Sequence, residues 1–228
     1  MTGTVFVTGG TGALGVHVTN HLLSLGWRVV VPFIHESEAA RLDAQDRLEL
    51  VRCNVAVSAE LTDAVAVAAG DPGAPLTALV NLVGGFESGP RTDEADAEAI
   101  DRQLDLNVRT TYAVLRECLP HLVANGGGSI VSMSSGAALK PFPGGTAYST
   151  SKAAVLALAE SIAVEYKKDR IRSNALLPGV IDTPANRAAM PNSDRANWVD
   201  PADIAKVIAF LLSDDSTPIS GAAIPLGL

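Results

Sequence analysis

Thr4-Val5-Phe6-Val7-Thr8 runs directly into Gly9-Gly10-Thr11-Gly12-Ala13-Leu14-Gly15 near the N-terminus of this 228-residue chain. The first five residues predict a short buried strand, and the apolar spacing over 16–25 predicts a helix after the turn. A glycine-rich turn between a strand and a helix lets the backbone approach a pyrophosphate, which the first N–H groups of the helix can bind. The stretch therefore predicts a dinucleotide site, an interpretation that depends on the motifs downstream.

Strand-like and helix-like segments alternate along the rest of the chain, which is typical of βαβ units and a parallel sheet. Strands are predicted at 4–8, 28–33, 48–53, 78–82, 129–134, 172–177 and 222–226. The two longest helical patterns cover about 96–123 and 146–168. We therefore expect an α/β fold with a doubly wound parallel sheet of about seven strands, helices on both faces, and residues 1–228 as a single domain.

Composition restricts the partners that we expect. The net charge of −8 argues against nucleic acid or an anionic membrane surface, because either would require a basic stripe. Apolar runs stay below the roughly 18 residues that a membrane span needs, and the N-terminus enters the first strand at once, so we expect a cytoplasmic protein. Neither the two cysteines nor the four histidines show metal-ligand spacing, and no metal is expected.

Tyr148 and Lys152 stand four residues apart in the pattern that predicts a helix over 146–168, so both lie on one helical face. A tyrosine with an ordinary pKa of about 10 exchanges protons poorly at neutral pH unless a nearby positive charge favours the phenolate. Lys152 is placed to supply that charge. Ser135 follows the strand predicted at 129–134, at the edge where open α/β sheets bind ligands.

These motifs, in this order, resemble the short-chain dehydrogenases/reductases over essentially the whole chain. The family's nucleotide turn is matched by Thr8, Gly9, Gly12 and Gly15, and its strand-four motif in part by Asn81-Leu82-Val83-Gly84. Its catalytic residues are matched by Ser135, Tyr148, Lys152 and Asn107, and its segment over the nicotinamide by the stretch from Pro178-Gly179 to Thr183. The resemblance implies a compact, single-domain Rossmann-type member.

The resemblance implies an NAD(P)(H)-dependent oxidoreductase that reduces a carbonyl to an alcohol, or performs the reverse reaction. Tyr148 would donate the proton, and Ser135 would hydrogen-bond the same substrate oxygen. Lys152 would lower the pKa of Tyr148 and bind the cofactor ribose, while Asn107 would orient a water that returns the proton. The cofactor-binding residues implied are Thr8, Gly9, Gly12, Ala13, Leu14, Gly15, Phe33, His35, Asn54, Val55, Asn81, Val83, Gly84, Tyr148, Lys152, Pro178, Gly179, Ile181 and Thr183.

Two positions depart from the family pattern. Ala13 stands where compact members usually carry glycine, which puts the turn geometry in question, and Leu82 replaces a second asparagine whose hydrogen bond stiffens the central strands. Cofactor choice depends on the end of the second strand, which reads Phe33-Ile34-His35 and carries neither a carboxylate nor an arginine. His35 or Arg41 could assist a 2′-phosphate, and Phe33 could pack on adenine. The sequence leans to NADP(H) over NAD(H).

Substrate identity is not encoded in any motif, and we expect a small carbonyl or alcohol compound. Phe86, Phe142, Met190 and Trp198 are the candidate substrate-lining residues, with the segment 184–198 as a short lid. Phe86, Phe142 and Met190 favour apolar or aromatic carbonyl compounds, although each could equally anchor a loop in the core.

Two other functions stay open at this point, a non-catalytic dinucleotide-binding regulator and an epimerase that uses bound cofactor. Apolar and alanine-rich faces over about 104–122 and 153–163 resemble the pair of helices through which family members associate. A homodimer or a homotetramer is therefore expected.

Overall fold

The computed structural model describes residues 3–227, so residues 1, 2 and 228 of the predicted domain lie outside the described residues. Within it, seven parallel strands form one sheet in the order β3-β2-β1-β4-β5-β6-β7. They are β1 (Thr4–Thr8), β2 (Arg28–Phe33), β3 (Leu48–Arg52), β4 (Leu76–Asn81), β5 (Gly128–Met133), β6 (Ile171–Pro178) and β7 (Ala223–Leu226). The predicted α/β class is confirmed. The strand order reverses between β1 and β4, and at such a switch point the crevice beyond the strand ends is open to a ligand.

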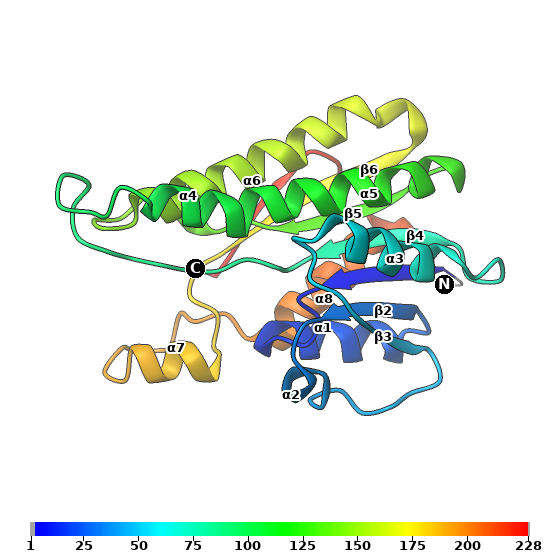
Figure 1. Cartoon of the computed structure of the whole chain (residues 1–228), viewed down its shortest axis with the longest axis horizontal. Coiled ribbons are helices and arrows are strands. Elements are labelled where there is room, and N and C mark those ends of the chain that lie inside the picture. Colours follow the sequence, from blue (N-terminus) through cyan, green and yellow to red (C-terminus); the bar gives the residue numbers. More distant parts are fainter. Residues whose placement is uncertain (1–2, 228) are drawn as a thin grey trace.

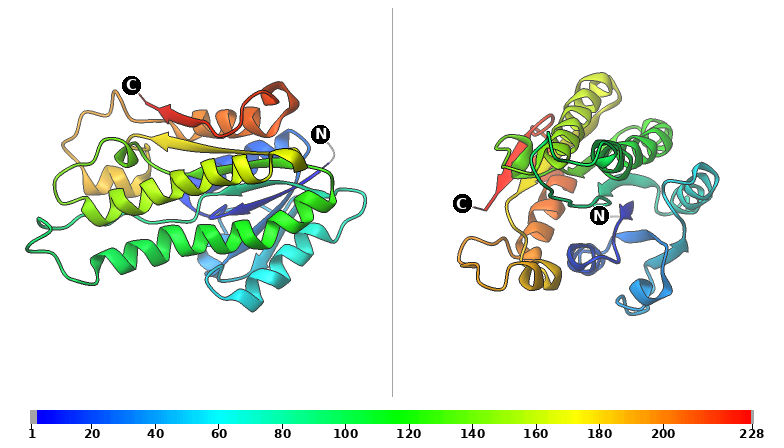
Figure 2. Two further views of the ribbon diagram at one scale, coloured as in Figure 1. Left: turned by 90° about the horizontal axis from the view of Figure 1, so that it is seen from above. Right: turned by 60° about the vertical axis from the view of Figure 1, so that its left-hand side comes forward.

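Helices cover both faces of this sheet, as predicted (Figures 1 and 2). One face carries α3 (Ser58–Ala69), α5 (Thr110–Ala124) and α6 (Thr146–Glu165), and the other carries α1 (Ala13–Ser24) and α8 (Pro201–Leu212). Three short helices lie near the ligand edge: α2 (Glu36–Ala39), α4 (Ala99–Gln103) and α7 (Pro184–Ala189). The sheet is thus enclosed in a three-layer α/β/α arrangement.

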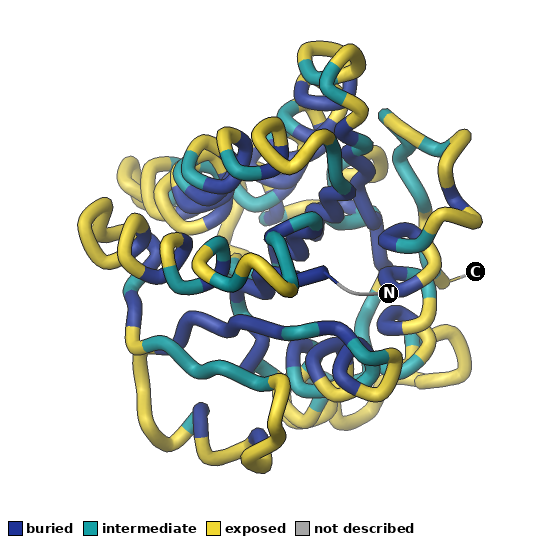
Figure 3. The backbone as a smooth tube through the Cα atoms, turned by 90° about the vertical axis from the view of Figure 1, so that its right-hand side faces the viewer, coloured by how far each residue is buried: buried dark blue, intermediate teal, exposed yellow. Residues whose placement is uncertain are grey.

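Alternation along the central strand β1 shows how the two core layers are filled. Val5 and Val7 pack with α1 and α8, whereas Phe6 between them packs with α3 and α5. All three side chains are fully buried, because successive residues of a strand point to opposite faces and both faces are covered here. Figure 3 shows the buried backbone running through the sheet and along the inner faces of the helices.

The helix predicted over 96–123 is divided in the structure. It consists of α4, a π-helical segment from Leu104 to Arg109, and then α5. A π-helical turn widens the backbone and often marks a functional position, and Asn107 lies within this one. The continuous apolar pattern gave no sign of the change. Among the described residues, no helix combines the length and hydropathy needed to cross a membrane.

Candidate active site

The turn from Gly9 to Gly15 is built by close backbone packing. Gly9 has a φ of +67°, a conformation that favours glycine. A Cβ added at Gly15 would lie 2.6 Å from the carbonyl carbon of Gly10 and closer still to the oxygen of Gly9. The Gly12 N–H donates to the Gly9 oxygen at 3.0 Å, and among the described residues no side chain caps the N-terminus of α1. The first turn of α1 is therefore open to an anion.

Ala13 does not disturb this turn. It is the first residue of α1 and its side chain is exposed. The helix therefore begins three residues before the predicted start at Val16, inside the glycine-rich stretch, and carries Leu14 and Gly15 in its first turn. The open helix terminus and the glycine cradle fit a dinucleotide pyrophosphate.

A cavity of about 480 Å³ lies beside this turn, at the carboxyl ends of β1, β2 and β4. Five of the residues expected to bind cofactor line it: Gly9, Phe33, Asn54, Val55 and Val83. Further lining residues were not identified from the sequence: Thr11, Pro32, Ile34, Glu38, Cys53, Ala56, Arg102, Asp105, Leu106 and Thr110. The mostly apolar walls and the volume suit a nucleoside.

The short helix α2 and the residues just after it bring two charged side chains to this region. Glu38 lines the cavity, and Arg41 donates from Nη1 to the Thr11 carbonyl at 3.2 Å. His35 occupies the N-cap of α2 and is exposed. A carboxylate near the ribose would repel a 2′-phosphate, whereas a guanidinium would attract one. Glu38 was not identified as a cofactor-site residue from the sequence. Its position in the short segment after β2, where cofactor choice is decided, was the signal that could have identified it.

Tyr148, Lys152 and Ser135 lie together at the carboxyl end of β5. Lys152 is 6% exposed, its Nζ lies 5.9 Å from the centroid of the Tyr148 ring, and it donates to the Met133 carbonyl at 3.1 Å. Burial lowers the pKa of Lys152 to about 8. Ser135 begins a turn in which its Oγ accepts from the Ala137 N–H at 3.2 Å.

The environment of Tyr148 differs from the expectation. Burial raises the pKa of this phenol above its usual value, and the neighbouring Ser135 hydroxyl opposes that shift. We expected the Lys152 ammonium to lower the pKa of Tyr148, but burial is the larger effect here, because the uncharged phenol is favoured away from water. The arrangement keeps Tyr148 protonated at neutral pH.

Asn107 is fully buried and joins three parts of the site. Its Oδ1 accepts from the Gly85 N–H at 2.9 Å. Its Nδ2 lies within hydrogen-bond distance of Gly85 O at 3.1 Å, Gln103 Oε1 at 3.1 Å and Ser151 Oγ at 3.0 Å. Since Ser151 in turn donates to the Tyr148 carbonyl at 2.8 Å, Asn107 connects α4, the segment after β4, and the start of α6.

Gly84 shows how closely Asn107 approaches Lys152. A Cβ added at Gly84 would lie 2.5 Å from Asn107 Oδ1 and 2.9 Å from Lys152 Nζ. The absence of a side chain at Gly84 therefore leaves room for both polar groups beside its backbone. A larger residue would force them apart.

A buried chain of hydrogen bonds links the nucleotide turn to Asn107. Thr8 Oγ1 donates to Asn81 Oδ1 at 2.5 Å, Asn81 Nδ2 donates to Thr111 Oγ1 at 2.8 Å, and Thr111 Oγ1 donates to the Asn107 carbonyl at 2.6 Å. Leu82 carries no polar side chain, but its N–H donates to the Thr8 carbonyl at 3.1 Å. The central strands are thus tied together without a second asparagine.

Of the four predicted substrate-lining residues, Phe86 adjoins Tyr148, and Phe142 lies beside Phe86. The Phe86 ring meets the Tyr148 ring edge-on, with centroids 4.9 Å apart, and Phe142 lies 6.1 Å from Phe86. Their loops are joined, because the Gly89 N–H donates to the Gly144 carbonyl at 2.9 Å and the Thr92 and Thr146 hydroxyls lie 3.0 Å apart. Phe86 is 64% exposed, so it presents apolar surface directly over the phenol.

The segment after β6, which contains the predicted cofactor residues from Pro178 to Thr183, is held by contacts with β7 and with the residues before α8. Gly179 donates to the Leu226 carbonyl just after Pro178, and Ile181 pairs with Val199 across a parallel bridge. Thr183 caps α7 by accepting from the Asn186 N–H at 3.3 Å, which is the structural role that its position before Pro184 also allows.

Met190 and Trp198 lie farther along the predicted lid. Met190 ends α7, and Trp198 lies under Arg195, whose guanidinium is 6.0 Å from the ring centroid. Trp198 lines a separate cavity of about 350 Å³ with residues of α8. Nothing in residues 3–227 gathers three or more His, Cys, Asp or Glu side chains in a group that could hold a metal ion.

Comparison with known proteins agrees with this geometry. A family model described as short chain dehydrogenase matches residues 3–194. The 2-(R)-hydroxypropyl-CoM dehydrogenase of Xanthobacter autotrophicus is 32% identical, over 98% of this chain and 96% of its own. A short-chain type dehydrogenase/reductase from Mycobacterium ulcerans superposes with a TM-score of 0.91 at 29% identity, over 98% of this chain and 87% of its own. The 3-ketoacyl-(acyl-carrier-protein) reductase of Brucella melitensis, complexed with NADH, superposes with a TM-score of 0.86 at 25% identity, over 98% and 96%.

Proposed function

Since this chain belongs to the short-chain dehydrogenase family, we propose that it is an NAD(P)(H)-dependent oxidoreductase that interconverts a carbonyl and an alcohol. The observation that carries the proposal is the group formed by Ser135, Tyr148 and the buried Lys152 at the open crevice of the sheet. Buried ionisable groups with shifted pKa values are typical of catalytic sites. Asn107 completes the proposed catalytic set.

Each of these residues has a role that follows from its surroundings. When bound, a reduced nicotinamide cofactor would supply the hydride. Tyr148 holds the proton for the new alkoxide, since burial keeps its phenol protonated. Ser135 bonds the same oxygen and fixes its position. In the reverse direction, the Lys152 ammonium 5.9 Å from the ring favours the phenolate that accepts the proton.

The residues present fit a dinucleotide. The open N-terminus of α1 and the Gly9–Gly15 turn would hold the pyrophosphate, the cavity lined by Phe33 and Val55 would hold the adenosine, and Lys152 would bind the ribose beside the reacting centre. The lean to NADP(H) stays a prediction. Arg41 beside the turn supports it, and Glu38 in the cavity opposes it.

The finer expectations about partners also stay predictions. The exposed Phe86 ring favours small apolar or aromatic carbonyl substrates. A homodimer or homotetramer, a cytoplasmic location, a single-domain organisation over 1–228, and a lack of nucleic-acid or membrane partners remain as the sequence predicts them.

The proposal is tested by following the absorbance of NADPH and NADH, supplied separately, over a panel of ketones, aldehydes, quinones, dihydropteridines and β-ketoacyl thioesters. We expect turnover in the wild type and a loss of about 10²–10⁴-fold in Tyr148→Phe, the range that a positioned proton donor contributes. Tyr112→Phe is the matched control, because Tyr112 is 58% exposed on α5. Activity that survives in Tyr148→Phe would contradict the proposed role.

The two other functions make different predictions for the same experiment. A non-catalytic regulator would bind both cofactors and turn over nothing on the panel. An epimerase would retain its cofactor through purification and show no net change in nicotinamide absorbance while its substrate is converted.

A further inference from the structure

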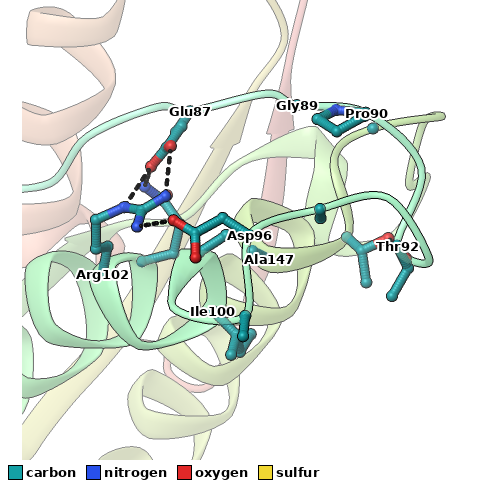
Figure 4. A pocket seen from close by; sticks show the side chains of 14 residues that line it. Glu87, Gly89, Pro90, Thr92, Asp96, Ile100, Arg102 and Ala147 are labelled. Atoms are coloured by element: carbon teal, nitrogen blue, oxygen red, sulfur yellow. Dashed lines mark hydrogen bonds and ion pairs between the residues drawn. The ribbon is translucent and has the colours of Figure 1, made fainter.

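Residues 84–98, which we call the substrate-side loop, carry Phe86 over Tyr148 and are held by an ionic cluster. Arg102 of α4 donates to Glu87 from Nη2 at 3.1 Å and to Asp96 from Nη1 at 2.6 Å. Arg102 holds the pKa of Glu87 below its usual value. The pKa of Asp96 is also lowered, mainly by a hydrogen bond from the Glu98 N–H and to a lesser extent by Arg102. Figure 4 shows Arg102 reaching both carboxylates. We call Glu87, Asp96 and Arg102 the Arg102 cluster.

The substrate-side loop has little else beneath it. A cavity of about 350 Å³ lies between the loop and the N-terminal ends of α4 and α6, with Thr92, Ile100 and Ala147 among its walls (Figure 4). Over this hollow the loop gains no support from close packing. Apart from the contact of Phe86 with Tyr148, its position therefore depends on polar contacts. The Arg102 cluster holds Glu87 and Asp96, and the joint with Gly144 holds Gly89 between them.

Gln103 connects this loop to the catalytic group. Its side chain is 3% exposed and lies between Glu87 and Asn107. The Gln103 Nε2 lies 3.5 Å from Glu87 Oε2, and the Gln103 Oε1 accepts from Asn107 Nδ2 at 3.1 Å. A buried amide whose two ends serve different partners holds both in one orientation.

We propose that Gln103 is a positioning residue that couples the substrate-side loop to Asn107. By accepting from Nδ2 it fixes the amide of Asn107, whose Oδ1 then holds the Gly85 N–H at the start of the loop. Through Ser151 the same amide is tied to the Tyr148 carbonyl. One buried amide thus serves both sides: its acceptor end holds Asn107 at the reacting centre, and its donor end lies toward Glu87 of the loop. The inference rests on the proposed function for its kinetic consequence alone.

Amide-resolved hydrogen exchange tests the coupling without a substrate. The Gly85 N–H depends on Asn107 Oδ1, whereas the Gly89 N–H depends on the Gly144 carbonyl and serves as an internal control. In Gln103→Leu we expect the Gly85 amide to exchange about tenfold faster, as loss of one buried hydrogen-bond partner implies, with Gly89 unchanged. Gln103→Glu keeps an acceptor for Asn107 Nδ2, so its Gly85 amide should exchange as in the wild type.

Kinetics on the carbonyl compound that the panel identifies tests the consequence. We expect Gln103→Leu to lower kcat about tenfold with the KM for cofactor unchanged. Gln103→Glu cannot donate to Glu87 and places a carboxylate beside it, so it should raise the KM for substrate while kcat stays within about twofold. Arg91→Gln removes the exposed ion pair with Asp93 from the same loop, and it should change neither quantity.

Either of two results would overturn the inference. One is a Gly85 amide that exchanges at the wild-type rate in Gln103→Leu. The other is an equal effect of Gln103→Leu and Gln103→Glu on kcat, which would mean that the acceptor for Asn107 is not what matters. If the panel shows no Tyr148-dependent turnover, the proposed function fails, while the exchange of Gly85 still decides whether the coupling exists.

Discussion

The two halves of the crevice are built in different ways. The nucleotide half consists of backbone packed against backbone at Gly9, Gly10 and Gly15, with a buried chain of hydrogen bonds behind it. The substrate half consists of the substrate-side loop, held over a cavity by the partly exposed Arg102 cluster, whose arginine also borders the nucleotide cavity. Rigid positioning suits a ligand of fixed shape, whereas a loosely supported wall can be changed without loss of the fold. The catalytic residues lie between the two.

The largest effect should come from breaking the nucleotide half. Gly15→Ala places a methyl group against the Gly9 and Gly10 backbone, which cannot move without displacing β1 or α1. We expect a loss of unfolding free energy of about 3 kcal/mol, at the upper end for an overpacked site, and cofactor affinity at least about a hundredfold lower. Urea denaturation and calorimetric titration of NADPH and NADH measure the two.

Gly12→Ala is the matched control for this substitution. A Cβ at Gly12 would approach only the Gly9 oxygen, at 3.2 Å, among the described atoms within 4 Å. Gly12→Ala should therefore lower the unfolding free energy much less than Gly15→Ala does. Equal losses in the two variants would show that the close packing seen at Gly15 does not determine the stability of the turn.

At the centre of the crevice, Lys152 should make the unfolding free energy depend on pH, by an amount similar to the loss expected for Gly15→Ala. Burial lowers the pKa of Lys152 to about 8, whereas a lysine in an unfolded chain titrates near ~10.4. Between these values the unfolded chain binds more protons, so the contribution of Lys152 to the unfolding free energy rises with pH. Below about pH 8 the buried charge of Lys152 lowers the unfolding free energy by its full amount. By about pH 10.4 the unfolding free energy has recovered by about 3 kcal/mol, because the folded protein no longer carries this charge.

Urea denaturation of wild type and Lys152→Met, at about pH 7 and about pH 10, measures this difference. We expect the stability of the wild type relative to the variant to increase with pH. Lys206→Met is the control, because Lys206 is exposed and its bond to Asp203 raises its pKa, which gives the opposite sign. A wild-type advantage that falls with pH would refute the burial of a charged Lys152.

The smallest effect on stability is expected in the substrate half. Phe86→Ala removes a ring that is 64% exposed, so the unfolding free energy should change by no more than about 0.5 kcal/mol. The KM for an apolar carbonyl substrate should rise about fivefold, because the wall over Tyr148 is lost. Steady-state kinetics and urea denaturation separate the two, with Phe210→Ala on α8 as the control for loss of an exposed phenylalanine. Strong destabilisation by Phe86→Ala would remove the contrast between the halves.

The positions of the strands along the chain followed from alternation and glycine punctuation, because these are local signals. Their order in the sheet comes from the structure. The π-helical segment around Asn107 did not, since the apolar spacing over 96–123 is continuous and carries no mark of a wider turn. The hydrogen-bond chain from Thr8 through Asn81 to Thr111 joins residues more than seventy positions apart at its first step. Such links depend on tertiary packing, which also brought Glu38 and Gln103 to the site without a motif.

The joint between the substrate-side loop and the segment before α6 limits how this protein can be redesigned. Gly144 has a φ of +76°, and a Cβ there would strike the Gly89 oxygen. Together with the Gly89 N–H bond and the Thr92–Thr146 pair, this makes the two segments a single interchangeable unit. A loop from a relative that replaces residues 84–98 alone would lose these contacts with the segment before α6. A chimaera with altered substrate range therefore has to carry residues 139–146 from the same donor.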